Sequence, residues 1–458
     1  MTTEALPAGM LARLEALGAE LIACAREHRD APLAKLEQAV LARVRAAQGG
    51  LLEEVVERST TSLRPQQARV RLDCPGCGER AGVQDWRTRR VRTVLGRIRF
   101  ERPWYVCGAC RHGWSPTDAT LELEPRARLS VGLQEWVGEV GAETAFRQGR
   151  RLLARLTGQQ FSKETIRRHS QRQGAALAAA QVAASAQVLR TREAAEPVDR
   201  APGHLLVEAD GVLVRYLDGW HEVKVGLVAG YVDGELVAPS YVAAREAAEA
   251  FGHRLLAEAA RRGALEIVAW KGGRTGRALG ILRRAAILGD GAPWIWTLAG
   301  EHFGERIEIV DFYHAVEHLW VVARALHGAD SPAGTAWAEA RRHELRHQGA
   351  APVRLALRQT APSTAEAREA VRLARGYFRT NADRMAYPTF RAAGLPIGSG
   401  AVEASAKHLV QQRMKRAGMR WSEPGARGLL ALLAHRASDR PMPAFAFLSH
   451  PQPRSQAA

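Results

Sequence analysis

The chain has 458 residues, enough for several domains and at least one large core. Its net charge of +17 favours a polyanionic partner such as nucleic acid. No apolar run approaches the roughly 20 residues that span a bilayer, and the first residues lack a secretory signal pattern. We therefore expect no membrane partner and a cytoplasmic location.

Residues 1–65 are predicted to form a helical N-terminal region. Leu11, Leu14, Leu17 and Leu21 recur at the three- and four-residue spacing of an amphipathic helix, and a second helix follows. The stretch "TTSLRPQQAR" then has the composition of a linker.

Two cysteine pairs come next, "CPGC" with Cys74 and Cys77 and "CGAC" with Cys107 and Cys110. In a cytosolic chain such pairs favour a metal over disulfides. Four thiolates can close a tetrahedral Zn²⁺ site that has no open position, although iron also accepts four thiolates. The intervening "RVRTVLGRIRFERPWYV" alternates polar and apolar residues like a β-hairpin. We expect a zinc-ribbon domain over 66–125 with a structural Zn²⁺.

The predicted hairpin is strongly basic and also carries aromatic residues. Arg89, Arg90 and Arg92 lie in one strand, and Trp86 and Trp104 are interleaved with the arginines. This composition is typical of a surface that binds a phosphate backbone and stacks on bases. The alternative is an ordinary edge strand that its charges protect from aggregation.

Residues 126–182 are predicted to form a helix-turn-helix-like DNA-binding domain. Ser162 can cap a second helix, which presents Lys163, Arg167 and Arg168 for contacts with DNA. The alternative is a helical connector with a solvated face. The inner face of the first helix is expected to contain Ala145, Leu152, Leu153 and Leu156.

The composition changes at "AASAQVLRTREAAEPVDRAPGH", which indicates a domain boundary. Three predicted strands follow, "HLLVEADGVLVRYL", "HEVKVGLVAGYV" and "ELVAPSYVAA", and then a helix. Two shorter strands, "RAAILGDGA" and "ERIEIVDFYHA", enclose the helix "PWIWTLAGEHFG". The order predicts an α/β domain with a mixed sheet flanked by helices, followed by a mostly helical stretch.

Three acids stand at the ends of predicted strands, namely Asp210, Asp290 and Asp311. One such residue is often only a turn former before glycine, but an acid at the end of a buried strand needs a partner or a metal. If the strands are adjacent, Asp210 and Asp290 converge, and Glu403 can reach the same point. Three carboxylates could then hold two Mg²⁺ (or Mn²⁺) ions about 4 Å apart for phosphoryl transfer.

Glu403 opens a helix whose later turns are basic, with Lys407, Arg413, Lys415 and Arg416. In this hypothesis the acid binds metal and the cations hold the DNA phosphates. The alternative for Glu403 is a surface i,i+4 ion pair with Lys407, which is worth a few tenths of a kcal/mol. That alternative leaves the preceding Gly/Ser turn unexplained.

Several segments together resemble DDE transposases of the ISKra-type bacterial insertion sequences. They are "CPGC…CGAC", "LSVGLQEWVGEVG", "VEADGVLVR", "WHEVKVGLV", "GDGAPWIW", "VDFYHAVEHL" and "IGSGAVEASAKHLVQQRMKRAGMRW". The resemblance implies a multidomain chain with an RNase H-like catalytic core, formed by 200–313 and 393–440. It also implies a helical insertion at 314–392, and residues 441–458 would be a flexible tail.

The resemblance also implies roles for individual residues. Asp210 matches the first catalytic acid and Glu403 the last, while strand order favours Asp290 over Asp311 as the middle acid. His314 and His318, beside Asp311, either orient DNA or water or are structural. Trp421 either stacks on a base or fills the core.

The implied partners are DNA, both element ends and target, and further copies of the chain in a homodimer or a higher synaptic assembly. The implied location is the bacterial nucleoid. Two alternatives remain open: a non-catalytic, sequence-specific DNA-binding protein derived from a transposase, and an RNase H-like nuclease that cuts without joining.

Overall fold

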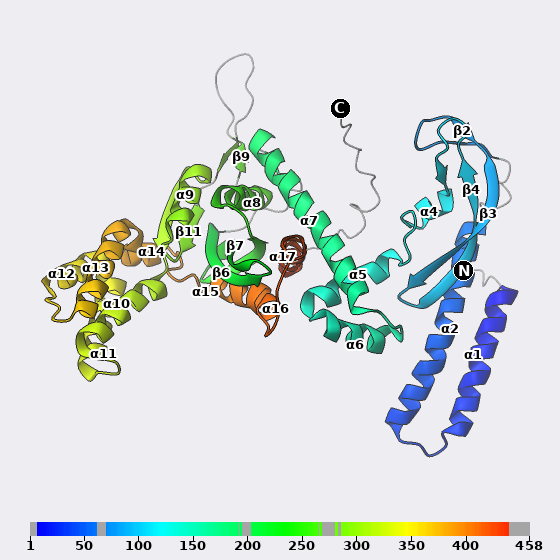
Figure 1. Cartoon of the computed structure of the whole chain (residues 1–458), viewed down its shortest axis with the longest axis horizontal. Helices are drawn as coiled ribbons and strands as arrows, with labels where there is room; N and C mark the ends of the chain where they lie inside the picture. The colour runs from blue at the N-terminus through cyan, green and yellow to red at the C-terminus, as the bar shows by residue number, and fades with distance from the viewer. Residues whose placement is uncertain are drawn as a thin grey trace, which may run out of the picture. The chain divides into compact units, whose positions relative to one another are not determined.

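A computed structural model describes residues 7–61, 70–191, 193–194, 203–263, 265–267, 280–282 and 285–438 (Figure 1). The described residues form two compact units, one up to Gln173 and one from Gly174 onward. Most of the predicted linker, at 62–69, and the predicted tail at 441–458 lie outside the described residues. Throughout the described part of the chain, each helix is too short or too polar to cross a membrane.

The first unit begins with the two expected helices, α1 (Ala8–Glu27) and α2 (Leu33–Thr61), which pack against each other. The expected hairpin follows as β3 (Val83–Thr93) and β4 (Gly96–Val106), two antiparallel strands. The short strands β1 (Leu72–Asp73), β2 (Arg80–Ala81) and β5 (Gly113–Trp114) flank it. The helical and hairpin predictions for this part of the sequence are therefore confirmed.

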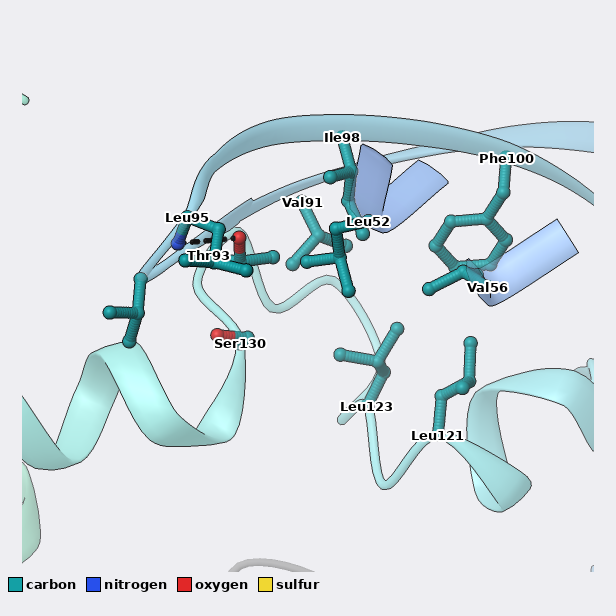
Figure 2. A pocket seen from close by; sticks show the side chains of 11 residues that line it. Leu52, Val56, Val91, Thr93, Leu95, Ile98, Phe100, Leu121, Leu123 and Ser130 are labelled. Carbon is teal, nitrogen blue, oxygen red and sulfur yellow. Dashed lines mark hydrogen bonds between the residues drawn. The ribbon is translucent and has the colours of Figure 1, made fainter. Parts of the chain in front are cut away.

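The hairpin packs on α2 through a small apolar core with an open hollow in it. Figure 2 shows Leu52 and Val56 of α2 facing Val91, Ile98 and Phe100 of the hairpin. The remaining lining residues are Thr93, Val94, Leu95, Leu121, Leu123 and Ser130. Because so few side chains fill this core, it gives the hairpin little stability of its own.

Four helices complete the region: α4 (Pro116–Thr120), α5 (Val131–Glu143), α6 (Phe146–Thr157) and α7 (Lys163–Thr191). The predicted cap is present, since the Ser162 hydroxyl accepts the Thr165 N–H at 2.9 Å. The expected inner face of α6 is partly wrong. Leu153 is buried, but Leu152 and Leu156 are exposed, because α6 buries only the narrow stripe of every fourth residue that contains Gly149 and Leu153.

The predicted boundary between domains at residue 182 does not coincide with a break in the structure. Helix α7 continues through this position to Thr191. Its residues up to Gln173 belong to the first unit and those from Gly174 to the second. The division therefore lies inside a helix, where a change in composition gives no signal.

The second unit is built on a five-stranded mixed sheet in the order β12-β11-β6-β7-β8. Strands β6, β7 and β8 are antiparallel, whereas β11 and β12 run parallel to β6. Their bounds are β6 His204–Tyr216, β7 Gly219–Val232, β8 Glu235–Ala244, β11 Ala285–Gly289 and β12 Arg306–Val310. A separate pair is formed by β9 (Leu265–Ile267) and β10 (Gly280–Leu282). The mixed α/β sheet expected from the sequence is thus present.

Helices cover both faces of this sheet. One face carries α8 (Ala248–Arg261) and α9 (Pro293–His302). The other carries α15 (Gly400–Ser405), the π-helical turn η2 (Ala406–Gln411), α16 (Gln412–Met414) and α17 (Glu423–Ala437). The core is strongly apolar, with Leu205, Val207, Phe251 and Ile287 fully buried.

The mostly helical stretch after β12 shares the core of the sheet. It consists of α10 (Phe312–His327), α11 (Pro332–Gln348), α12 (Ala350–Gln359), α13 (Ala365–Thr380), η1 (Ala382–Met385) and α14 (Tyr387–Ala392). Buried side chains such as Leu319, Val353 and Phe378 belong to the same cluster as the strands. These helices are therefore an integral part of the second unit.

Helices α7 and α17 approach each other with no room for a side chain. A Cβ atom added at Gly174 would lie 1.8 Å from the carbonyl oxygen of Gly428. We predict that Gly174→Ala lowers the free energy of unfolding by about 1–3 kcal/mol, because two helix backbones must separate. Urea unfolding of the full chain measures it.

Gly376→Ala is the matched control, since a Cβ there in α13 meets nothing within 4 Å. We expect this variant to be neutral or more stable by up to about 1 kcal/mol. Equal stabilities of the two variants would contradict the close approach.

Candidate functional site

The register of the sheet places two of the predicted acids next to each other. Gly289 of β11 lies opposite Ala209 of the parallel strand β6. The next residues along the two strands are Asp290 and Asp210, so they are neighbours where the β6–β11 pairing ends. The prediction that Asp210 ends its strand is wrong, because β6 continues past it to Tyr216 in its pairing with β7. Asp311 follows the end of β12, one strand further along.

The turn that carries Asp290 favours glycine at both neighbouring positions, 289 and 291. A Cβ at Gly289 would lie 2.6 Å from the Ile295 side chain, and Gly291 has φ +103°, a conformation that favours glycine. The Asp290 carboxylate accepts the Ala292 N–H at 2.8 Å, just before α9 begins. The turn therefore fixes the position of Asp290 at the edge of the sheet.

The third acid, Glu403, comes from α15, which packs on β6 and β7. Its N–H donates to the Ser399 carbonyl at 3.1 Å, and its side chain is exposed. The helix is held to the sheet by Glu208, a buried acid of β6 that accepts the Val402 N–H at 2.8 Å. Because Glu208 and Asp210 are two residues apart, they point to the same face of the sheet as α15.

Three of the predicted acids interact electrostatically. Burial raises the pKa of Asp210 to about 6, and the charges of Asp290 and Glu403 contribute to the rise. The N–H of Gly211, at 2.7 Å, and the His314 side chain act in the opposite direction. We call Asp210, Asp290 and Glu403 the acidic trio.

Asp311 has a different environment from the acidic trio. It is buried, and one oxygen accepts the His314 N–H at 2.7 Å as the N-cap of α10. The other oxygen accepts both the N–H and the hydroxyl of Ser399. The Gly/Ser turn before α15 is therefore explained by a tie between the starts of α10 and α15. Asp290, and not Asp311, is therefore the acid that follows the strand paired directly with β6.

Two residues at this site had not been singled out in the sequence. Glu208 is one, and burial together with the charge of Asp311 raises its pKa to about 8. A signal existed for it, since "VEAD" places two acids on one face of a strand. Tyr377 of α13 is the other, and its hydroxyl donates to the Asp290 carbonyl at 3.1 Å. No local pattern marks this contact.

His314, His318 and Trp421 have different environments. His318 stacks on the Tyr377 ring at 4.0 Å between centroids, so it has a packing role. His314 lies 3.6 Å from the Glu317 carboxylate, and its charge lowers the pKa of Asp210. Trp421 is buried, and its indole N–H donates to the Met414 carbonyl at 3.0 Å, so it fills the core and is not available for base stacking.

Three of the ten arginines and lysines predicted to bind DNA are at least partly buried and held within the protein, and the exposed Arg167 and Arg416 also bond to Glu164 and to the Gln412 carbonyl. Arg413 is only 2% exposed and lies against the Trp421 ring. Arg89 donates to the carbonyls of Glu124 and Ala127. Arg92 bonds to Gln159 and Gln160 and lies over Phe161, so its guanidinium is committed as well. The other seven are exposed: Arg90, Lys163, Arg167, Arg168, Lys407, Lys415 and Arg416.

The four predicted metal ligands of the first unit do converge. The sulfur atoms of Cys74 and Cys110 are 3.5 Å apart, as are those of Cys77 and Cys107, and all four lie within 4.8 Å. Four sulfurs around Zn²⁺ with bonds near 2.3 Å would be separated by about 3.8 Å. The cluster can therefore hold a structural metal such as zinc.

Among the described residues, this cysteine cluster is the only group of three or more ligand side chains that lie so close together. The oxygens of the acidic trio are more widely spaced. Oxygen donors of this kind suit Mg²⁺ or Mn²⁺ rather than zinc.

Comparison with known proteins gives a partial match. Residues 32–228 match the model of UPF0236, described as an uncharacterised protein family. A UPF0236 protein in the vanSb 3′ region of Streptococcus gallolyticus is 29% identical over 171 residues. This match covers 35% of each protein, so the chain spans about a third of the length of this relative. The family match includes the four cysteines and Asp210 but ends before Asp290 and Glu403.

We predict that the purified chain contains one equivalent of zinc, and that Cys107→Ser loses it. The hairpin should then become susceptible to proteolysis, because its apolar core is small. Elemental analysis by mass spectrometry distinguishes zinc from iron. Cys24→Ala is the control, since this thiol lies in α1 outside the cluster. A metal-free wild-type chain with an intact hairpin would contradict the prediction.

Proposed function

We propose that this protein is a DDE-type DNA transposase, which cuts DNA at the ends of an insertion sequence and joins those ends to target DNA. The observation that carries the proposal is the acidic trio at one edge of the mixed sheet. Support also comes from the strand order, in which an antiparallel meander is followed by two parallel strands. That order is expected of the RNase H-like core which the resemblance implies.

The residues fit a divalent metal site of the kind such an enzyme uses. Asp210, Asp290 and Glu403 would supply carboxylate oxygens, the ligands that Mg²⁺ and Mn²⁺ prefer. Two bound ions would stabilise the charge that develops on the attacking and leaving oxygens of an in-line phosphoryl displacement. Since positioning and charge stabilisation suffice for this reaction, no side-chain nucleophile is required.

The basic surface would bind the DNA. Lys407 lies one turn beyond Glu403 and is exposed, and Lys415 and Arg416 follow at the end of the same helical segment. In the first unit, Lys163, Arg167 and Arg168 would contact DNA from the exposed start of α7, with Arg90 on the hairpin as a further contact. The four-cysteine cluster, with zinc bound, would stabilise that hairpin. Working on bacterial DNA, the protein would be nucleoid-associated.

The first test measures cleavage and strand transfer on a plasmid that carries the element's own ends, with Mg²⁺ or Mn²⁺. We predict that Asp210→Asn, Asp290→Asn and Glu403→Gln each lower cleavage at least about 100-fold, because each removes a charged ligand from the site. Binding to the DNA ends should persist in all three.

Glu317→Gln is the matched control, since it removes a neighbouring exposed carboxylate outside the acidic trio. It should cut like the wild type. No cutting by a folded, end-binding wild type would favour a non-catalytic DNA-binding protein. Cutting without joining would favour an RNase H-like nuclease.

A second prediction separates the two candidates for the middle acid. Asp311→Asn should lower the free energy of unfolding by about 1–3 kcal/mol, because an amide NH₂ would replace an oxygen that accepts hydrogen bonds in a buried site. Asp290→Asn should change stability little, since its carboxylate accepts only one N–H near the surface of the site. Urea unfolding measures both, and a stable Asp311→Asn that no longer cuts DNA would reverse the assignment.

A further inference from the structure

The N-terminal helical hairpin, α1 with α2, buries very little of its own apolar surface. Cys24 is the one buried side chain of α1. In contrast, Leu11, Leu14 and Ile22 of α1 are exposed, with Ile22 at 58%. On α2 the exposed apolar side chains include Leu33, at 70%, with Val40 and Leu41.

Exposed apolar side chains are concentrated in these two helices. Of the 22 large hydrophobic side chains exposed in the described part of the chain, seven belong to α1 and α2, including Val55. Scattered single exposures are normal on a protein surface, but a dense set on one element indicates an interaction site.

Five of these seven side chains fall on one face of the hairpin. Each residue of an α-helix advances by about 100°. Leu17, Leu21 and Cys24 lie on the side of α1 that faces α2, which we call the seam. Leu11, Leu14 and Ile22 therefore lie about a quarter turn further round α1. A rotation of about 60–80° separates Leu33 and Val40 of α2 from its own seam, which Gly50 and Glu54 mark by their contacts with α1.

Because α1 and α2 are antiparallel, a rotation in the same sense from each seam places the exposed residues of both helices on the same side of the hairpin. We call this set the apolar stripe: Leu11, Leu14, Ile22, Leu33 and Val40. On α1, the ion-paired residues Arg13 and Glu27 lie on the other side of the seam, where they meet Glu54 and Arg43 of α2. The hairpin thus has one apolar face and one ion-paired face.

The charge of the hairpin argues against DNA as the partner of the apolar stripe. Residues 8–61 contain seven Lys and Arg and eight Asp and Glu, a net charge of −1. The whole chain carries +17, so the remaining residues carry +18. An apolar, near-neutral face offers nothing to phosphates, but it allows two copies of this basic protein to approach without strong repulsion.

We infer that the apolar stripe pairs with the same stripe of a second copy of the chain, forming a four-helix bundle around a twofold axis. A self-complementary patch is what such symmetry requires. The stripe has three-, seven- and eight-residue spacings, as in Leu11/Leu14, Leu33/Val40 and Leu14/Ile22, which are typical of helices that pack in bundles. The pairing does not depend on the proposed catalysis.

The test compares the full chain with two double variants by sedimentation equilibrium, at a salt concentration that keeps it free of nucleic acid. Ile22→Glu with Val40→Glu places two charges on the apolar stripe of each copy. We expect the dimer dissociation constant to rise at least about 100-fold, since four carboxylates would be buried without partners. Circular dichroism should show unchanged helix content, because both positions are exposed in the single chain.

Ala16→Glu with Ala42→Glu is the matched control. It adds the same charges at exposed positions on the opposite face of the hairpin. This variant should remain as dimeric as the wild type. A monomeric wild type, or equal association of the two double variants, would overturn the inference. Either result leaves the plasmid cleavage assay to decide the proposed function separately.

Discussion

The parallel pairing of β6 with β11 is the constraint on which the candidate site depends. It sets two acids side by side at a partly buried edge of the sheet, where carboxylates are costly to place. Hydrogen bonds from backbone N–H groups offset that cost. Helices α9, α10 and α15 all begin at this edge, and an N–H at or near the start of each donates to an acid, respectively Asp290, Asp311 and Glu208. The positive ends of three helix dipoles therefore converge where negative charge collects.

This arrangement divides the acids into two groups with different physical roles. Glu208 and Asp311 are buried, and hydrogen bonds to the first turns of helices satisfy them. They determine where α15 lies on the sheet. Asp210 and Glu403 retain oxygens that no helix start satisfies among the described hydrogen bonds, and the charge of Glu403 contributes to the raised pKa of Asp210. In the proposed function, a cation bound beside these oxygens would offset the repulsion between the acids.

Local sequence patterns predicted the elements of this site better than their contacts. Alternation located the strands and Asp-Gly pairs located Asp210 and Asp290, because those signals depend on neighbouring residues. They did not show that β6 continues past Asp210 to Tyr216, which depends on its pairing with β7. The bond from Tyr377 to the Asp290 carbonyl joins residues 87 positions apart, and no local pattern encodes it. Likewise, the sequence showed that Arg413 is charged but not that Trp421 covers it. Burial of a cation depends on tertiary packing, so basic residues at similar spacing had different outcomes.

The distribution of charge suggests how one chain can combine DNA binding with self-association. A strongly basic protein repels its own copies, and that repulsion opposes any assembly in the absence of DNA. Here the excess of cations lies entirely outside α1 and α2, which are near neutral and carry the apolar stripe. Lysines and arginines exposed near the acidic trio and on the first unit would be neutralised when DNA binds, whereas contacts of the hairpin need no such neutralisation. Salt should therefore weaken the two kinds of contact unequally, because counterion release governs the first and burial of apolar surface governs the second.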